Sequence, residues 1–519
     1  MSEHPDRPDP LSLPVFNSGA SASSNRTTGD GVRARLSSPG VPRQPDRLAA
    51  AGAPEVAVAA QTDTYSAGVD WKEVAIHRAQ ASTRLTQALN NEGVIGREAE
   101  RELGRAIIQD VLQDAVNEAA SSGRGDTWSD KRRSAFAVAI FDAVFRMGRF
   151  SPLLDNDRIE NIMVMNGCDN VWLELDDGSI VRGPAVADTD EELIDFLAFI
   201  ASKSEVNART FTPNKPDLDM RLDDGSRLSA SAWVNPRPTV VIRRHRLSRI
   251  TLGELVARGT LTPIAASFLS AAIKAKKSVV VAGPQGAGKT TLVRALCAEF
   301  DRFERVGTFE TEYELHLHEM PDRHPMCVPY EARPGSGEVD AQGNEAGAYS
   351  LDRAIYVSFR KNLSRYVIGE VRGPEVWAMV KAMESGYGSL STTHASDAEA
   401  AIRKLVTCAM EAGPHVTREL ATSKLAECID VVVQMHLQTT FVDSDEARRQ
   451  RWVSEIITVS PGELAKGYST THVFRPRADG PAVAGTLPDD MRALEAHGFD
   501  LSGYLAEGGS WVADEVGGA

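Results

Sequence analysis

Apolar residues recur at helical spacing in the first third of the 519-residue chain. Residues 98–120 place Leu103 and Ile107 four positions apart within a longer repeat of the same kind, which predicts an amphipathic helix. Residues 134–147 repeat the pattern after a glycine-containing break. The spacing therefore predicts a small helical bundle over residues 66–150.

After residue 150 the pattern changes to short apolar runs separated by turn signals. Strands are expected at residues 159–164, 171–175, 219–222, 227–232 and 240–243, and an amphipathic helix is expected at residues 191–203. The first two strands indicate a hairpin, followed by the turn Asp176-Asp177-Gly178, and Asp224-Gly225 joins a second hairpin. Together they predict an α+β N-terminal domain over residues 151–247.

Residues 248–460 alternate apolar strands with helical stretches, which is typical of a parallel α/β sheet. Near the end of this region, residues 452–459 are consistent with an edge strand. Residues 461–519 are charged and glycine-rich, and we interpret them as a carboxyl-terminal extension. Residues 1–65 are rich in Pro, Ser, Gly, Ala and Arg, so we expect a disordered tail that lacks enough apolar surface to fold.

A glycine-rich segment between a predicted strand and a predicted helix carries the clearest chemical signal. The strand is the β-branched run at 279–282, and the helix begins near Leu292. The residues expected to bind nucleotide are Gly283, Pro284, Gln285, Gly286, Ala287, Gly288, Lys289, Thr290 and Thr291. Such a loop directs backbone N–H groups at phosphate oxygens, its lysine reaches the β- and γ-phosphates, and the Thr290 hydroxyl is the expected Mg²⁺ ligand.

Two acidic residues at the ends of predicted strands supply candidates for activating water. Glu310 ends the run at 305–310, and Glu370 ends the run at 366–370. In an open parallel sheet, such ends lie beside the phosphate loop. His394 follows a Gly-, Ser- and Thr-rich turn, and a neutral imidazole there is able to sense the γ-phosphate.

Composition excludes several other classes of protein. The formal charge of −15 disfavours direct binding to nucleic acid, because like charges repel. The five cysteines show no C-x-x-C spacing, so neither a zinc ribbon nor a disulfide framework is expected. The chain has no apolar run of membrane-spanning length and no secretory signal pattern, so we expect a cytoplasmic protein.

Four motifs in this order resemble those of the type II/type IV secretion ATPase superfamily, in particular its Tad/Flp pilus assembly branch. They are the Walker A loop at 283–290, the Asp box at 309–315, the Walker B segment with Gly-Glu-Val-Arg-Gly at 369–373, and the His box at 388–395. The resemblance covers roughly residues 100–460 and includes arginines at family positions in the N-terminal domain. One departure is Thr311, which stands where the family's Asp box usually has aspartate.

The resemblance implies a RecA-like P-loop ATPase domain at residues 248–460 that binds ATP and Mg²⁺. Glu370 would polarise water with help from Glu310, His394 is the His-box histidine, and Arg372 belongs to the catalytic group. Other arginines are implied to reach nucleotide within one subunit or across a boundary: Arg221, Arg227, Arg243, Arg244, Arg333 and Arg360.

The same resemblance implies a homohexamer that is cytoplasmic and peripheral at the inner face of the cell membrane. There it would drive an inner-membrane platform protein of a pilus or secretion system. Two alternatives remain open: a weakly or non-hydrolysing nucleotide-gated scaffold, suggested by Thr311, and a conjugative or DNA-transfer ATPase.

Overall fold

A computed structural model describes residues 69–512, with gaps at 93–95, 124–126, 204–209, 245–248, 334–346, 385–387 and 463–465. The tail expected at residues 1–65 lies outside the described residues, as does the end of the predicted carboxyl-terminal extension. Among the described helices, no stretch combines the length and the apolar composition needed to cross a lipid bilayer.

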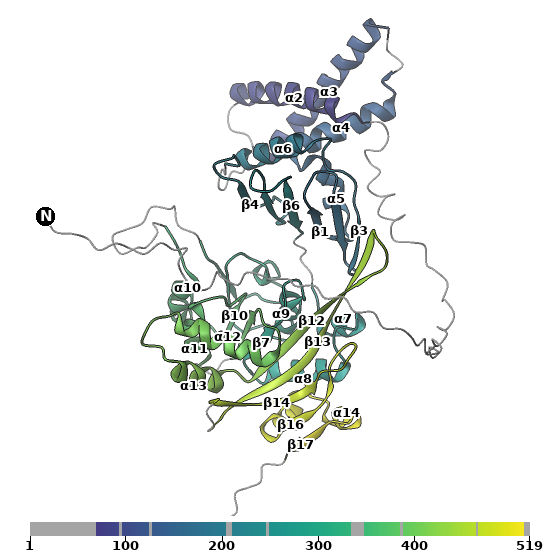
Figure 1. Ribbon diagram of the computed structural model, residues 1–519. Helices are drawn as coiled ribbons and strands as arrows, with labels where there is room; N and C mark the ends of the chain where they lie inside the picture. Colours follow the sequence, from purple (N-terminus) through teal and green to yellow (C-terminus); the bar gives the residue numbers. More distant parts are fainter. Residues whose placement is uncertain are drawn as a thin grey trace, which may run out of the picture. The chain divides into compact units, whose positions relative to one another are not determined.

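Three helices form the amino-terminal part of the described chain (Figure 1). They are α2 (Trp71–Glu92), α3 (Arg97–Ser121) and α4 (Asp130–Phe145). Their apolar stripes meet in one cluster, in which Leu112, Phe136 and Ile140 are fully buried. The helix expected at 98–120 is therefore confirmed, and burial of this shared stripe is what holds the three helices together.

An antiparallel sheet follows, with strands in the order β4-β5-β6-β1-β2-β3. Its strands are β1 (Ile159–Val164), β2 (Val171–Leu175), β3 (Ser179–Arg182), β4 (Asp217–Arg221), β5 (Arg227–Ser231) and β6 (Thr239–Arg243). The helical elements of this region are η5 (Gly148–Phe150), α5 (Ser151–Asp155) and α6 (Asp190–Lys203). Both expected hairpins are present, and the turn at 176–178 leads into β3, a strand that the pattern did not predict.

The sheet continues into a parallel part with the order β12-β7-β11-β10-β8-β9. The strands are β7 (Val279–Ala282), β8 (Val306–Glu310), β9 (Cys327–Glu331), β10 (Arg365–Ile368), β11 (Ser389–Thr393) and β12 (Val431–Phe441). The helices are α7 (Leu252–Ala257), α8 (Pro263–Lys274), α9 (Lys289–Cys297), η6 (Leu317–Glu319), α10 (Leu351–Ser358), η7 (Phe359–Lys361), α11 (Glu375–Met383), α12 (Ala398–Met410) and α13 (Arg418–Cys428).

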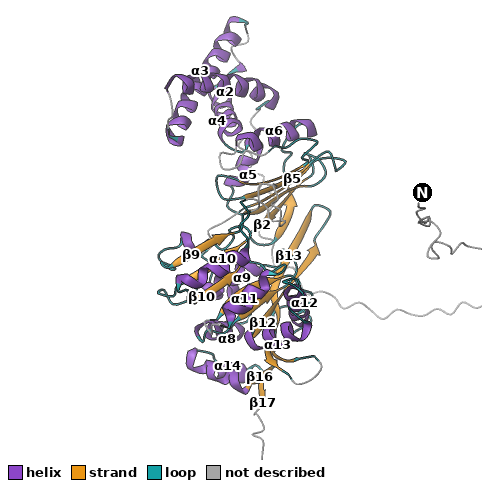
Figure 2. Cartoon of the chain, turned by 90° about the vertical axis from the view of Figure 1, so that its left-hand side faces the viewer, coloured by secondary structure: helices purple, strands orange, loops and turns teal. Residues whose placement is uncertain are grey.

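Alternate residues of β7 face two different cores. Val279 and Val281 belong to one apolar cluster, whereas Val280 and Ala282 belong to the other. Since successive strand residues point to opposite faces, the parallel sheet is covered on both sides, as α/β sheets require. Helices lie alongside its strands in Figure 2, and the expected RecA-like α/β fold is the one observed.

Strand β13 (Glu446–Pro461) is not an edge strand, so the interpretation of residues 452–459 was wrong. It pairs with β12 along one side and with β14 (Tyr468–Arg475) and β3 along the other. Figure 1 shows β12 and β13 as two long strands that lie side by side. Of these partners, β3 is far from β13 along the chain and leaves no local signal, and the many charged residues near the start of β13 resemble those of an exposed edge.

The carboxyl-terminal residues complete the first of the two cores. They contain β15 (Val483–Ala484), β16 (Thr486–Pro488), η8 (Asp489–His497), α14 (Leu501–Ala506) and β17 (Ser510–Val512). Tyr504 is fully buried, its ring contacts Phe474 and Phe499, and its hydroxyl donates to the Val473 carbonyl at 2.9 Å. These aromatic residues lie in the same cluster as Val279 of β7.

We expect Tyr504→Ala to lower the free energy of unfolding by about 3–5 kcal/mol, because it empties a large buried site. The matched control is Leu505→Ala at the neighbouring, 37% exposed position, which should cost less than about 1 kcal/mol. Denaturant titration measures both changes. Equal losses would contradict a structural role for this segment.

Candidate functional site

The loop after β7 has a backbone that only glycine accommodates at its first position. Gly283 has a φ of 148°, and a Cβ atom there would lie 2.7 Å from the carbonyl oxygen of Met435. Gly286 and Gly288 also have positive φ values, 76° and 86°. Helix α9 begins directly after this loop, at Lys289. The arrangement presents a helix N-terminus to an anion, as a phosphate site requires.

Lys289 is the buried cation of this loop, with 8% of its surface exposed. Its ammonium donates to the carbonyl oxygens of Gly283 at 3.1 Å and Pro284 at 3.0 Å, and it lies 3.1 Å from Nδ1 of His394. Burial lowers the pKa of Lys289 to about 8, although Glu370 and a second carboxylate, Glu314, oppose the shift. A phosphate anion would favour the charged form, so the site is suited to binding one.

His394 joins the lysine to Glu370. Because the Lys289 ammonium donates to Nδ1, the ring proton lies on Nε2, which is 2.9 Å from Oε1 of Glu370 in a close contact that lacks hydrogen-bond geometry. Burial, with Lys289 next, lowers the pKa of His394, which favours the neutral ring. The predicted His-box and Walker B residues are thus adjacent in the fold.

Glu370 stays a carboxylate although it is largely buried. Burial by itself would raise its pKa, but the hydrogen bond from Arg372, at 2.7 Å, and the neighbouring charges of Arg372 and Lys289 bring the pKa below its ordinary value. Glu370 follows β10 by two residues, at the strand end where the sequence placed it. A carboxylate at this position is able to orient a water molecule.

Glu314 is a site residue that the sequence analysis did not select. Its Oε2 accepts a hydrogen bond from the Thr290 hydroxyl at 2.8 Å, and its Oε1 accepts one from Arg227 at 2.8 Å. Burial alone would raise the pKa of Glu314, but Arg243, Arg227 and the Thr290 hydrogen bond lower it. A hydroxyl beside a carboxylate offers the hard oxygen ligands that suit Mg²⁺. Its position as the later glutamate of the Asp box was the signal available in the sequence.

The Glu310 side chain, in contrast, points into the protein interior and accepts hydrogen bonds from the backbone. It is 2% exposed, and its Oε1 accepts from the N–H groups of Glu314 at 2.8 Å and Leu315 at 2.9 Å. Burial raises its pKa from 4.5 to about 7. Gly369 leaves room for it, since a Cβ atom there would lie 2.9 Å from Cγ of Glu310. This geometry suits a residue that positions Glu314 and favours Glu370 as the one that contacts water.

The remaining loop residues and arginines fall into several groups. Within the loop, Pro284 and Gln285 are exposed, Ala287 is buried and Thr291 is partly buried.

Of the arginines, Arg227 and Arg243 reach Glu314, the latter at 3.7 Å, and Arg372 reaches Glu370. Arg244 donates to carbonyls at 156 and 159, Arg333 donates to the Gly347 carbonyl, Arg221 lies near Tyr313, and Arg360 is exposed in η7. Only the first three therefore contact site carboxylates within one chain.

A further link joins the phosphate loop to the antiparallel sheet. Arg451 of β13 donates to the Gly286 carbonyl at 2.7 Å and also pairs with Glu174 of β2. Glu174 is 1% exposed and accepts from Arg449 and Asn161 as well, each at 2.9 Å. The sequence contained no local signal for this link, because β2 and β13 are far apart along the chain.

Comparison with known proteins places these features in a family. The profile of the family described as Type II/IV secretion system protein matches residues 189–472, more than half of the chain. A Mycobacterium tuberculosis protein named for conjugal transfer is 27% identical over 350 residues, covering 66% of this chain and 92% of that protein. Type IV secretion system protein VirB11 of Brucella suis is 28% identical over 320 residues, covering 56% and 85%.

Two solved structures are also similar. The VirB11 ATPase of the Brucella suis type IV secretion system gives a TM-score of 0.29 at 24% identity, covering 59% of this chain and 92% of that chain. The Legionella pneumophila ATPase DotB gives a TM-score of 0.42 at 20% identity, covering 62% and 82%.

We expect Glu314→Gln to weaken Mg²⁺-dependent ATP binding by roughly 10–100-fold, because the carboxylate beside Thr290 loses its charge. Glu312→Gln is the matched control, since Glu312 also pairs with Arg227, at 2.8 Å, but does not contact Thr290. Titration with a fluorescent ATP analogue, with and without Mg²⁺, measures both. Equal weakening in the two variants would remove Glu314 from the site.

Glu310 should also make stability depend on pH. Burial raises the pKa of this carboxyl from 4.5 to about 7 in the folded state. Such a group stabilises the fold at low pH, and this contribution is lost as the pH rises from the unfolded-state pKa through the folded-state pKa. Glu310→Gln keeps an acceptor for the two backbone N–H groups but does not titrate. Between pH 5 and 8, the wild type should therefore lose on the order of 1–3 kcal/mol relative to this variant.

Thermal unfolding measured across that pH range, with the exposed Glu411→Gln as control, tests the expectation for Glu310. The Glu411→Gln profile should run parallel to the wild type. A Glu310→Gln profile that also runs parallel would mean that Glu310 is ionised in the fold at all these pH values.

Proposed function

Because this chain belongs to the Type II/IV secretion system protein family, we propose that it is a Mg²⁺-dependent ATPase whose nucleotide binds at residues 283–290 and whose turnover drives secretion or pilus assembly. The observation that carries the proposal is the contact series from Lys289 through His394 to Glu370. This series brings together a cation that would bind phosphate, a neutral imidazole ring and an ionised carboxylate that would orient water.

Binding begins with the phosphate loop. The loop and the N-terminus of α9 receive the phosphates, and Lys289 exchanges its contacts with the Gly283 and Pro284 carbonyls for phosphate oxygens. Thr290, with Glu314 behind it, would hold Mg²⁺, which supplies charge neutralisation for the β- and γ-phosphates when bound. Hydroxyl and carboxylate oxygens fit that ion well.

Hydrolysis then requires an oriented water molecule. Glu370 is ionised, and His394 lies between it and Lys289. We therefore assign Glu370 to accept the hydrogen bond of the attacking water. Arg372 holds the other carboxylate oxygen and fixes its direction. His394 reports the presence of phosphate, since its Nδ1 loses its donor when Lys289 moves to the anion. Glu310 keeps Glu314 in place and does not act on water.

Movement would follow from the arginines that reach Glu314. Arg227 and Arg243 come from β5 and β6 of the antiparallel sheet, whereas Thr290 belongs to α9. A change in charge at Thr290 on loss of γ-phosphate therefore alters the attraction between Glu314 and these strands. We propose that this attraction couples turnover to displacement of the N-terminal domain (residues 151–247) against the ATPase domain (residues 248–460).

The finer assignment follows the motifs. We propose a homohexamer in which arginines such as Arg221 and Arg333 approach a neighbouring subunit's nucleotide. The motor would be cytoplasmic and peripheral at the inner membrane face, acting on a platform protein of a Tad/Flp-type pilus or a related secretion system. The four motifs at 283–290, 309–315, 369–373 and 388–395, taken in this order, support that assignment.

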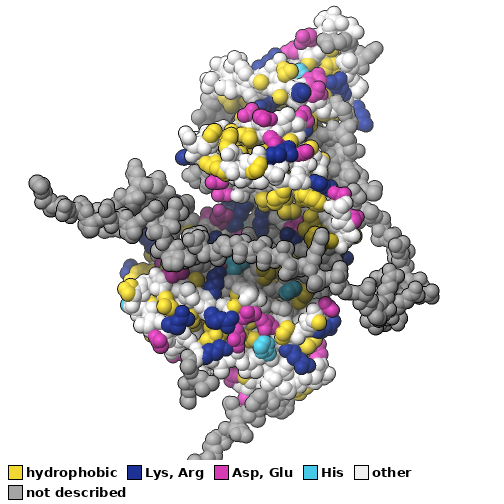
Figure 3. All heavy atoms as spheres, in the orientation of Figure 1, with side chains coloured by type: hydrophobic (Ala, Val, Ile, Leu, Met, Phe, Trp, Pro, Cys, Tyr) yellow, Lys and Arg dark blue, Asp and Glu magenta, His cyan; other side chains and the backbone are white. Residues whose placement is uncertain are grey.

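A second candidate is DNA transfer, suggested by the name of the M. tuberculosis relative. The formal charge of −15 speaks against direct DNA binding. In Figure 3, acidic and basic side chains are interspersed on the face shown, over the residues that are described. Stimulation of turnover by single- or double-stranded DNA at moderate salt would favour this candidate, and its absence would favour a protein cargo.

Steady-state phosphate release tests the proposal on the wild type, Lys289→Ala and Glu370→Gln. We expect Mg²⁺-dependent turnover in the wild type and a loss of at least about 100-fold in each variant, because one lacks the phosphate cation and the other the ionised carboxylate. Glu370→Gln should still bind ATP, whereas Lys289→Ala should not.

Particle size is read in parallel by light scattering, and a ring-sized species is expected. The control for turnover is Glu375→Gln, because Glu375 accepts from the backbone N–H groups of Arg372 and Gly373 and glutamine keeps an acceptor oxygen there. Tight ATP binding without turnover in the wild type would instead support the nucleotide-gated scaffold, with Thr311 as the sequence feature behind it.

A further inference from the structure

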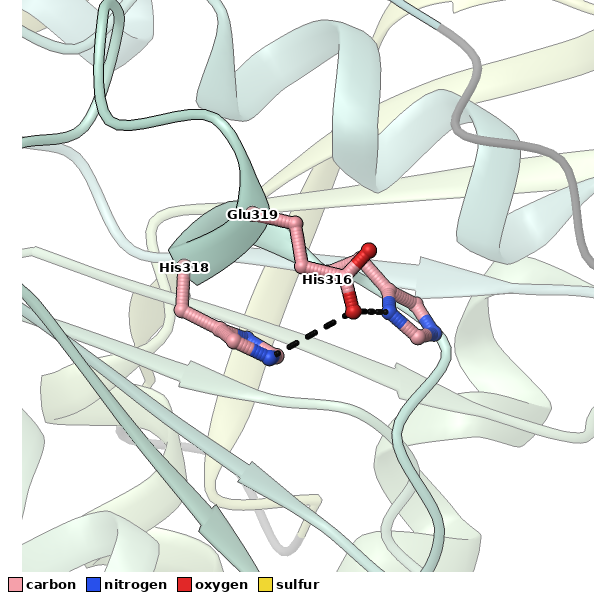
Figure 4. A group of neighbouring side chains, drawn as sticks. All are labelled: His316, His318 and Glu319. Atoms are coloured by element: carbon pink, nitrogen blue, oxygen red, sulfur yellow. Dashed lines mark hydrogen bonds and ion pairs between the residues drawn. The ribbon is translucent and has the colours of Figure 1, made fainter. Parts of the chain in front are cut away.

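Three side chains beside the Asp box gather their potential ligand atoms. His316, His318 and Glu319 surround the single turn η6, and Figure 4 shows the two rings directed at the carboxylate between them. His316 Nδ1 lies 2.7 Å and His318 Nε2 lies 3.7 Å from Oε1 of Glu319. One ligand atom from each residue lies within 4.8 Å of the others, the only such group of three among the residues that the structure describes.

Local backbone geometry produces this grouping. His316 precedes η6 in the left-handed conformation, with φ 49° and ψ 32°, which is uncommon for a residue with a side chain. The turn brings Glu319 back to His316, three residues earlier, so that its Oε1 lies 2.7 Å from Nδ1. The ring of Tyr313 packs 5.1 Å from that of His318, between ring centroids, and restrains it.

Both ring nitrogens of His316 lie at hydrogen-bond distance from oxygen atoms. Its Nε2 lies 3.1 Å from the carbonyl oxygen of Tyr313, and its Nδ1 lies 2.7 Å from the Glu319 carboxylate. A metal ion bound at Nδ1 would replace the proton that the ring shares with this carboxylate. Nε2 would then carry the N–H and donate it to the Tyr313 carbonyl, as metal-bound histidines do. Arg221 also lies near the ring, 3.4 Å away at Nε2 and not at Nδ1.

We propose that His316 Nδ1, His318 Nε2 and the Glu319 carboxylate bind a Zn²⁺ ion. Two imidazoles and one carboxylate suit zinc, which leaves a fourth position for water. In a tetrahedral site with Zn–ligand bonds of about 2.0–2.1 Å, ligand atoms lie about 3.3 Å apart. The separations of 2.7 and 3.7 Å bracket that value, and all three ligand atoms lie within 4.8 Å of one another, so side-chain rotation would bring them to the ion. The nitrogen ligands distinguish it from the oxygen site expected for Mg²⁺ at Thr290.

The ion would act on the segment that carries Glu314. The segment 310–319 begins at the buried Glu310 and contains Glu314, which accepts a hydrogen bond from Thr290. It ends at the proposed zinc ligands. Zinc would restrain the second end of this segment, as Glu310 restrains the first. This effect on Mg·ATP affinity rests on the proposed function, whereas zinc binding itself does not.

Titration calorimetry with ZnCl₂ on the full chain, prepared without a histidine tag and treated with chelator, tests the site. We expect saturable binding of one ion per chain, weakened at least about tenfold in both His318→Asn and Glu319→Gln. These side chains are partly exposed, at 26% and 41%, so both variants should fold. The control is His472→Asn, because His472 pairs with Glu455 at 2.9 Å but lies outside the three-residue group.

The outcomes are distinct. Absence of one-site binding, or binding that His318→Asn leaves intact and thiol alkylation abolishes, would overturn the zinc site. Visible absorption of bound Co²⁺ in the wild type, lost in His318→Asn, would support it independently of activity.

Zinc should also change Mg·ATP affinity in the wild type but not in His318→Asn, and no change would overturn the effect on the Glu314 segment. If the wild type binds no ATP, the proposed function fails while the zinc titration still reports on the site.

Discussion

The hydrogen bonds from the backbone of Glu314 and Leu315 to the buried carboxylate of Glu310 determine the geometry of the candidate site. They hold the chain after β8 in a turn that brings the Glu314 side chain to Thr290. Glu310 is nearly inaccessible to water, and burial raises its pKa to about 7. The interaction therefore links the position of Glu314 to the protonation of a buried residue that does not itself reach Thr290.

The site as a whole concentrates opposite charges away from solvent. Lys289 is paired indirectly with Glu370 through His394, and Glu314 is balanced by Arg227 and Arg243. Ionised groups in such surroundings remain charged only while their partners are near. Under the proposed function, adding or removing phosphate would disturb that balance, and the arginines beside Glu314 belong to the antiparallel part of the sheet. This is the route by which hydrolysis would cause movement.

Hairpin β12–β13 provides a second connection between the antiparallel and parallel parts of the sheet. It continues the parallel strands, pairs with β3 and carries Arg451, which binds both the Gly286 carbonyl and the buried Glu174. A buried carboxylate with one arginine removed would be left poorly compensated, so this link resists separation. The phosphate loop is thus connected to the antiparallel strands in two ways, through Arg451 of β13 and through Glu314.

The sequence alone determined those features that depend on neighbouring residues. Apolar spacing was enough to predict α3, α6 and both hairpins, and the glycine pattern at 283–288 was enough to predict the phosphate loop, because turn and helix preferences act over a few residues. The positions of Glu370 and His394 followed from strand ends and glycine turns in the same way. Their adjacency in the fold agrees with that prediction.

Only the tertiary structure decided which distant residues meet. Pairing of β13 with β3 and β14 overturned the edge-strand interpretation, and the contact of Thr290 with Glu314 added a carboxylate that the sequence analysis had not selected. The buried aromatic residue Tyr504 could not be inferred from a segment whose local composition is charged. Such contacts depend on the register and packing of elements far apart in the chain, which burial of a shared core selects and local sequence does not encode.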